Sequence, residues 1–343
     1  MRCSPWIALA GAACFFTACG SDASESSTSS VAETVVSDDS LTPTTDGSEI
    51  QESQNQESEN LPVVAVTYSA VESIVSDIVG DLARVVVVVP NGTDPHDFEP
   101  SAKDVELLAS ASLVVANGLD LEEGLEDALT EAEQAGTPVF HLTDHVTLRE
   151  GGDDGHDHGS EEKEEKEEEG DSHDSHGAQD PHVWLDPMTL AEAIPALAEE
   201  LSAAVGADLT EQGEAVATDL GVLSASIEAK VGSLEKCVLI TGHDSLGYFG
   251  ARYGCEVLGS IVPSFSSAAE ASAGDLAEIK TLAEAEQVKA VFTELGTPKG
   301  VAEQLAKELG IDVVELAHHF VPENGGYEEM MSILADSIVS ALS

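Results

Sequence analysis

Three histidines of this chain lie in short segments rich in Pro, Gly and Asp, where an imidazole could bind a metal ion. The segments are Asn91-Gly-Thr-Asp-Pro-His-Asp-Phe-Glu-Pro around His96, Asp180-Pro-His-Val-Trp-Leu-Asp-Pro around His182, and Thr241-Gly-His-Asp-Ser-Leu-Gly-Tyr-Phe around His243. Neutral imidazole nitrogens are the usual nitrogen ligands of zinc, and a tetrahedral ion needs about four donors. A single loop histidine is more often a surface or hydrogen-bonding residue, so it is the joint pattern of three that favours a metal site.

Aspartates stand close to all three histidines in the sequence. Asp97, Asp186 and Asp244 could accept the second ring N–H and so fix the tautomer that binds the metal.

The elements that must position these histidines alternate from Pro62 onward. Near-continuous apolar runs, typical of strands covered on both faces, occupy residues 63–66, 85–89, 113–116 and 139–142. Helical spacing fills residues 70–80, 101–110 and 121–134, with Ser69 and Ser101 as the expected N-caps. A second series has strands at 237–240, 255–258, 290–293 and 313–316, and helices at 245–253, 274–285, 298–309 and 327–342. This alternation predicts an α/β fold with parallel sheets.

Two of the histidines directly follow predicted strands, one in each series. His96 follows the strand that ends at Val89, and His243 follows the strand that ends at Ile240. Ligand sites of open parallel sheets form at the carboxyl ends of the strands. The sequence therefore predicts a metal site between the two halves of the chain.

An Ala-rich stretch from Met188 to Leu234 separates the two series. It predicts two helices, the second from about Ala207 to Leu234, and such a helix of about 28 residues would extend roughly 40 Å. The predicted organisation is an N-terminal lobe at 61–187, connecting helices at 188–234 and a C-terminal lobe at 235–343.

The first 19 residues have the pattern of a secretion signal. Arg2 precedes an apolar run from Trp6 to Phe16 that is too short to span a bilayer. The run ends in Phe16-Thr-Ala-Cys19, which resembles a bacterial lipobox with Phe in place of the usual Leu. We expect Cys19 to be lipidated and to anchor the protein on the outer face of the cell membrane; an ordinary cleaved signal is the alternative.

Composition agrees with export. Residues 20–60 are polar and Ser-rich, which predicts a flexible tether. The net charge of -53 would repel nucleic acid and attract cations. Of five cysteines, only Cys237 and Cys255 remain after signal removal and lipidation, and both begin predicted parallel strands. Since such strands start at one edge of a sheet, a disulfide between them is expected.

Residues 150–180 interrupt the alternation with acidic runs and four histidines, His156, His158, His173 and His176. We interpret this segment as a mobile low-complexity loop that gathers metal ions weakly and passes them on. A solvated acidic spacer with incidental histidines is the alternative.

The chain resembles the metal-binding solute-binding proteins of zinc and manganese ABC transporters, the ZnuA/TroA-like or cluster A-I family. The resemblance covers about residues 61–343. Four segments carry it, in the family's order: 92–100, 180–187, 242–254 and 291–294. The resemblance implies a chelatase-like solute-binding fold, in which two pseudo-symmetric α/β lobes are joined by a long rigid helix. It assigns the metal to a cleft between the lobes, with His96, His182 and His243 as ligands.

The fourth ligand is where this sequence departs from the family. The family often places an Asp at the position matching Ala317 to His319, but this chain reads Glu315-Leu-Ala-His-His-Phe there. We expect His318 to be the fourth ligand, with His319, Glu315 or water as alternatives. Glu294 also matches a family residue, and we expect it to support the site rather than bind the metal.

Three histidines favour zinc over manganese, which usually draws more carboxylate oxygen. The expected function is extracytoplasmic high-affinity zinc binding by a monomer that delivers the metal to an ABC transporter permease, without catalysis. A manganese-binding component and a surface adhesin are alternatives. A zinc hydrolase with Glu294 as base is a third, but the sequence contains no His-Glu-x-x-His motif or nucleophile elbow.

Overall fold

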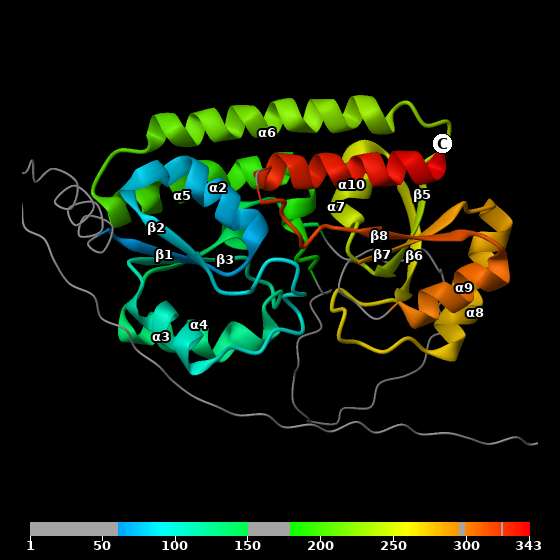
Figure 1. The fold of residues 1–343 in the computed structure, drawn as a ribbon, viewed down its shortest axis with the longest axis horizontal. Helices are drawn as coiled ribbons and strands as arrows, with labels where there is room; N and C mark the ends of the chain where they lie inside the picture. Colours follow the sequence, from blue (N-terminus) through cyan, green and yellow to red (C-terminus); the bar gives the residue numbers. More distant parts are fainter. Residues whose placement is uncertain (1–60, 150–178, 295–298, 324) are drawn as a thin grey trace, which may run out of the picture. The chain divides into compact units, whose positions relative to one another are not determined.

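The computed structural model describes residues 61–149, 179–294, 299–323 and 325–343. The predicted secretion signal, the expected lipidation site at Cys19, the predicted tether and residues 150–178 of the predicted acidic loop lie outside these described residues. The described part contains two groups of parallel strands with helices packed around them (Figure 1).

The N-terminal group is one parallel sheet of order β2-β1-β3-β4, formed by β1 (Val63–Val66), β2 (Arg84–Val87), β3 (Leu113–Ala116) and β4 (Val139–His141). Val64 and Val66 pack in one core with α2 (Ser69–Val79) and α5 (Pro187–Val205). Ala65 and Val114 pack in a second core with α3 (Ala102–Ser110) and α4 (Glu126–Ala135). Helices therefore cover both faces of the sheet, which is why its strands read as unbroken apolar runs.

One of the two predicted helix caps is confirmed and one is wrong. Ser101 precedes α3 and forms a capping box with Asp104, whose Oδ2 accepts from the Ser101 backbone N–H at 2.7 Å. Tyr68, not Ser69, stands at the N-cap of α2. The Ser69 hydroxyl instead donates to Oδ1 of Asn91 at 3.1 Å, so it joins α2 to the loop that carries His96.

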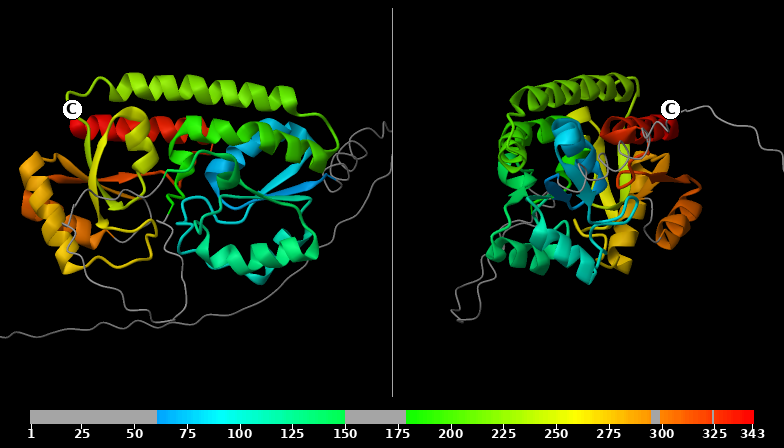
Figure 2. Two further views of the ribbon diagram at one scale, coloured as in Figure 1. Left: turned by 180° about the vertical axis from the view of Figure 1, so that it is seen from behind. Right: turned by 60° about the vertical axis from the view of Figure 1, so that its left-hand side comes forward.

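The C-terminal group consists of two parallel strand pairs that contact each other through β5 and β7: β5 (Val238–His243) with β6 (Glu256–Val262), and β7 (Ala290–Glu294) with β8 (Asp312–Leu316). Helices α7 (Gly247–Tyr253), α8 (Ala273–Glu286), α9 (Gly300–Leu309) and α10 (Gly326–Leu342) pack around them (Figure 2). The predicted end of β5 at Ile240 is wrong. The strand continues through Thr241 and Gly242 to His243, which pairs with Val262. His243 is therefore fixed by a strand ladder rather than by a loop.

The connecting helices are α5 and α6 (Thr210–Val231). The two predicted helices are present, but the second begins at Thr210 rather than about Ala207 and ends at Val231 rather than Leu234. Gly206 ends α5 in the left-handed conformation, and Asp208 accepts hydrogen bonds from the N–H and hydroxyl of Thr210 at the start of α6. The 22 residues of α6 extend about 33 Å. Helix α6 packs on α2 of the first group and on α7 and α10 of the second (Figure 1), so it spans both.

A disulfide joins Cys237 and Cys255, whose Cα atoms lie 4.6 Å apart at the start of β5 and β6. Among the described residues, no helix is both long enough and apolar enough to cross a membrane.

Candidate metal centre

His96 lies in the turn that follows β2. The strand pairing continues past β2, where Val88 and Val89 donate to backbone oxygens of Val66 and Thr67 at 2.9 Å. The backbone N–H of His96 donates to Oδ1 of Asp94 at 3.1 Å, and the side chain is buried. The ladder and this turn thus fix where the ring of His96 points.

His182 lies between the gap in the described chain and the short helix η4 (Val183–Leu185). The preceding peptide is fixed by Asn117, whose Nδ2 donates to the carbonyl of Pro181 at 2.8 Å. Nδ1 of His182 lies 2.8 Å from Oδ1 of Asp180, which leaves Nε2 as the ring nitrogen directed away from the carboxylate. The side chain is fully buried, with its ring centroid 5.3 Å from that of Trp184.

His243 ends β5 and faces a carboxylate on the neighbouring strand β7. Its Nδ1 lies 3.1 Å from Oε1 of Glu294, and the hydroxyl of Ser245 also donates to this oxygen at 3.3 Å. A Cβ at position 242 would overlap the carboxylate of Glu294. Gly242 is therefore needed to let the carboxylate reach the ring.

The three rings meet through their Nε2 atoms. Nε2 of His182 lies 3.4 Å from that of His96 and 3.1 Å from that of His243. All three residues are buried, and one ligand nitrogen of each lies within 4.8 Å of the others. Zinc–nitrogen bonds of 2.0–2.1 Å in a tetrahedron require neighbouring ligand nitrogens about 3.3 Å apart. Two of the three nitrogen pairs, His182 with His96 and His182 with His243, therefore already have the spacing that a zinc ion needs.

His318 and His319 follow β8 beside these rings, and both are buried. The ring of His318 lies 6.4 Å from that of His243 and 4.2 Å from that of His319, centroid to centroid. His318 is not part of the group whose nitrogens lie within 4.8 Å. Within the described part of the chain, neither ring nitrogen of His318 has a hydrogen-bond partner. Unpaired buried polar atoms are rare and point to an ion or water that supplies the partner.

Glu315, another alternative for the fourth ligand, lies away from the group of histidines. Oε2 of Glu315 pairs with Nζ of Lys299 at 2.8 Å, and the Glu315 side chain is 39% exposed. The structure does not bring this carboxylate into the group of histidines.

Burial keeps most of these imidazoles neutral. Burial, together with the charge of His243, lowers the pKa of His96 to about 4. Burial likewise holds the pKa of His182, His318 and His319 well below the ordinary value. Neutral rings offer the lone pairs that a metal ion requires.

His243 is the exception. Burial alone would lower the pKa of His243, but the hydrogen bond and the charge of Glu294 raise it. Burial would raise the pKa of Glu294, but the hydrogen bond and charge of His243 lower it to about 2. Glu294 is therefore an anion, and it compensates part of the positive charge that a bound metal would bring.

The carboxylates that contact the rings differ from those expected from the sequence. Asp186 does not serve His182; it caps α5 by accepting from Met188 at 2.9 Å and pairs with Arg252 at 2.7 Å. The carboxylate that contacts Nδ1 of His182 is Asp180, and the one that contacts Nδ1 of His243 is Glu294. Asp180 was missed although it precedes His182 by two residues and is closer in sequence than Asp186; the Asp-Pro-His spacing was the available signal.

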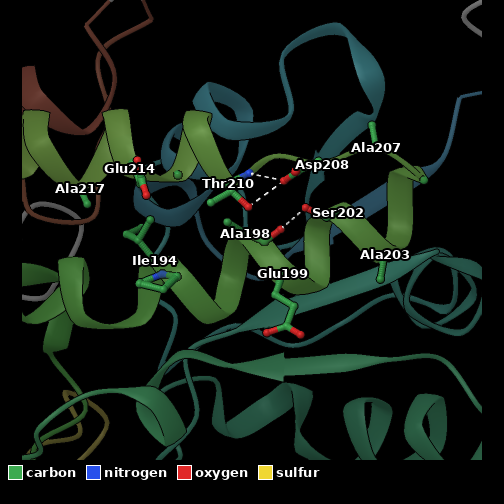
Figure 3. Close-up of a pocket in the computed structure, with 13 residues that line it drawn as sticks. Ile194, Ala198, Glu199, Ser202, Ala203, Ala207, Asp208, Thr210, Glu214 and Ala217 are labelled. Atoms are coloured by element: carbon green, nitrogen blue, oxygen red, sulfur yellow. Dashed lines mark hydrogen bonds between the residues drawn. The ribbon is translucent and has the colours of Figure 1, made fainter.

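A groove of about 720 Å³ between α5 and α6 contains none of these histidines. Figure 3 shows small side chains in its lining, such as Ala198 and Ala217, the carboxylates of Glu199 and Glu214, and the hydrogen bonds of Ser202 to Ala198 and of Thr210 to Asp208. It is a packing gap between two helices that offers no group of metal ligands.

Comparison with known proteins agrees with this geometry. The family model described as zinc-uptake complex component A, periplasmic (ZnuA) matches residues 64–341. The chain belongs to the ZnuA family. The predicted resemblance and the α/β fold with parallel sheets are confirmed, and the family consists of extracytoplasmic solute-binding proteins.

Several members of the ZnuA family and its structural relatives are similar along most of the chain. The zinc-binding protein TroA of Treponema pallidum is 27% identical over 316 residues, which cover 85% of this chain and 92% of TroA. Its solved structure matches with a TM-score of 0.69 at 26% identity, over 83% of this chain and all of that one. The high-affinity zinc uptake system protein ZnuA of Bacillus subtilis is 31% identical over 265 residues, 75% of this chain and 78% of that protein.

One structural relative is described as both an adhesin and a metal transporter. The laminin-binding protein of Streptococcus agalactiae matches with a TM-score of 0.66 at 22% identity, over 82% of this chain and all of that one. At this identity the likeness shows a shared fold alone.

Proposed function

We propose that this protein captures zinc outside the cytoplasm and delivers it to an ABC transporter permease in the membrane. The observation that carries the proposal is the set of three buried histidines whose Nε2 atoms lie 3.1 and 3.4 Å apart. Zinc is the transported substrate here, so binding and release are the whole reaction.

Zinc is favoured over manganese by the chemistry of the donors. His96, His182 and His243 offer three nitrogens, and the carboxylates of Asp180 and Glu294 lie against Nδ1 of His182 and Nδ1 of His243, on the sides of these rings away from Nε2. Manganese binds best where carboxylate oxygens enter the coordination sphere. A manganese-binding component therefore remains the second candidate, with zinc the first.

His318 completes the coordination in this proposal. It is buried next to His243, and its ring nitrogens have no partner among the described residues. We propose that one of these nitrogens turns toward the three Nε2 atoms when zinc binds. His319 or water would fill the position if His318 does not.

The arrangement does not favour a hydrolase. A general base has to reach a metal-bound water, whereas Oε1 of Glu294 already accepts from the backbone N–H of His243 and the hydroxyl of Ser245 and lies 3.1 Å from Nδ1 of His243. We therefore propose that the protein binds metal without catalysing a reaction.

Location and assembly belong to the same proposal. We propose that Cys19 carries the lipid anchor, that residues 20–60 tether a monomeric protein to the outer face of the membrane, and that the lobes divide at 61–187, 188–234 and 235–343. The 150–180 loop would gather ions for the site, and adhesion would be an additional role.

The deciding experiment is a competitive titration of the purified protein, from residue 20 on, with zinc and manganese. We expect one tightly bound zinc per chain and preference for zinc. The variant in which His96, His182 and His243 are all Ala should lose tight binding. Undiminished tight zinc binding in that variant would overturn the proposal, and preference for manganese would favour the second candidate.

A further inference from the structure

Arg149 and Asp180 lie on the two sides of the gap between residues 149 and 179, and the chain brings them together. The backbone N–H of Asp180 donates to the carbonyl of Arg149 at 3.2 Å. Nη1 of Arg149 lies 3.3 Å from Oδ2 of Asp180. The guanidinium is partly exposed, at 32%, while the carboxylate is fully buried.

The two oxygens of Asp180 have different partners. Oδ2 faces Arg149, whereas Oδ1 accepts from the backbone N–H of His182 at 3.0 Å and lies 2.8 Å from its Nδ1. One carboxylate therefore connects a cation to the ring that occupies the middle of the histidine group.

The tautomer of His182 decides whether it can bind metal. Its Nε2 faces the Nε2 atoms of His96 and His243, so this nitrogen has to present a lone pair and Nδ1 has to hold the proton. A carboxylate oxygen that accepts from Nδ1 selects this tautomer. The orientation of the Asp180 carboxylate depends in turn on what holds its other oxygen, Oδ2.

We propose that Arg149 is a positioning residue for zinc binding: through Asp180, it holds the ring of His182 with Nε2 directed at the metal position. This inference rests on the zinc-binding function proposed above. The contact of Arg149 with one oxygen stops the carboxylate from rotating away from the ring, and it compensates a charge that would otherwise be buried alone.

The position of Arg149 is itself set by α7, which belongs to the C-terminal strand group. The backbone N–H of Arg149 donates to the hydroxyl of Tyr248 at 2.9 Å. At the neighbouring position, a Cβ on Gly247 would overlap Nη1 of Arg149 and come within 2.7 Å of Oδ2 of Asp180. Gly247 therefore leaves the space in which the ion pair forms.

The test measures zinc affinity of Arg149→Ala and Arg149→Lys in the full chain from residue 20. Loss of a partner outside the metal ligands typically weakens binding 10- to 100-fold, so we expect about a tenfold loss in Arg149→Ala and partial recovery in Arg149→Lys. Arg252→Ala is the matched control. It removes a partly exposed cation from another buried carboxylate, Asp186, and should leave zinc affinity within about twofold.

A second readout needs no metal. The ¹⁵N chemical shifts of the His182 ring in the zinc-free protein should show the Nδ1–H tautomer in the unchanged protein and in Arg252→Ala, but a mixture in Arg149→Ala. Gly247→Ala should shift both readouts in the same direction while keeping Arg149 and Asp180. Gly221→Ala, a helix position with open space around it, is its control.

The outcomes separate this inference from the proposed function. If the unchanged protein binds no zinc tightly, the proposed function fails. If it does, but Arg149→Ala keeps its affinity and tautomer, or Arg252→Ala loses as much affinity, Arg149 has no positioning role.

Discussion

Nδ1 of His243 and Oε1 of Glu294 lie 3.1 Å apart across the neighbouring strands β5 and β7. This contact fixes the ring, directs Nε2 toward His182, and places a negative charge next to the three imidazoles. We therefore expect Glu294→Gln to weaken zinc binding about 10- to 100-fold. Competition against a chromophoric chelator measures the change. Glu315→Gln, which breaks a surface pair with Lys299, should leave the affinity unchanged; equal effects of the two would contradict a specific role for Glu294.

Zinc binding should release a proton near neutral pH. Burial alone would lower the pKa of His243, but Glu294 raises it above the ordinary value, so this ring keeps its proton to higher pH than a free imidazole and zinc has to displace that proton from Nε2. We expect proton release on zinc binding that is larger at acidic pH and falls toward zero as the pH rises. Calorimetry in two buffers of different ionisation enthalpy counts the protons. Release that does not decrease with rising pH would show that another group supplies them.

The zinc-free protein should lose stability as the pH falls below 6.5. The pKa of His96 is lowered from 6.5 to about 4, so between these values the unfolded chain binds a proton that the folded chain does not. His96 alone would lower the free energy of unfolding by up to about 3 kcal/mol. His182, His318 and His319 act in the same direction. The raised pKa of His243 acts in the opposite direction, since its contribution is full below 6.5 and is lost at higher pH.

Urea unfolding with a chelator present, at pH 7 and pH 5, measures this loss. Trp184 is the only tryptophan from residue 20 on, so its fluorescence reports the unfolding directly. His96→Gln should reduce the difference between the two pH values. A zinc-free protein that is equally stable at both values would show that these histidines are not neutral in the folded state.

Replacement of His318, the proposed fourth ligand, should weaken zinc binding without abolishing it, unlike replacement of the other three histidines. We expect His318→Ala to weaken zinc binding about tenfold without abolishing it, because three nitrogens remain. His318→Asp adds a carboxylate oxygen and should raise manganese affinity relative to zinc. His319→Ala is the control, and a larger loss in it than in His318→Ala would assign the fourth position to His319.

The disulfide should stabilise the fold without affecting the metal site. Cys237 and Cys255 close a loop with a sequence separation of 18, for which the expected contribution is about 3 kcal/mol. Cys237 precedes β5, roughly 20 Å of strand from His243 at the other end. We expect the double Cys→Ala variant to lose about 3 kcal/mol in urea unfolding while its zinc affinity stays within about twofold. A large loss of affinity would mean that the strand order of β5 and β6 depends on the disulfide.

The sequence by itself predicted the order of strands and helices and singled out the three histidines that the structure brings together. The apolar runs at 63–66 and 113–116 are strands with these bounds, because burial on both faces leaves an unbroken apolar pattern that is readable locally. The start of α6 differs from the predicted one, because the left-handed Gly206 and the hydrogen bonds of Asp208 interrupt a helical pattern that is continuous in the Ala-rich sequence.

Only the tertiary structure decided which groups meet across the chain. Glu294 lies 51 residues from His243, and Arg149 lies 31 residues from Asp180; no local pattern pairs them. Asp186 was the carboxylate expected at His182, yet the turn at Asp180-Pro-His folds the preceding carboxylate onto the ring and leaves Asp186 to cap α5. The geometry of a metal site depends on such long-range contacts, because ligand nitrogens about 3.3 Å apart require backbones from separate elements to be fixed relative to one another.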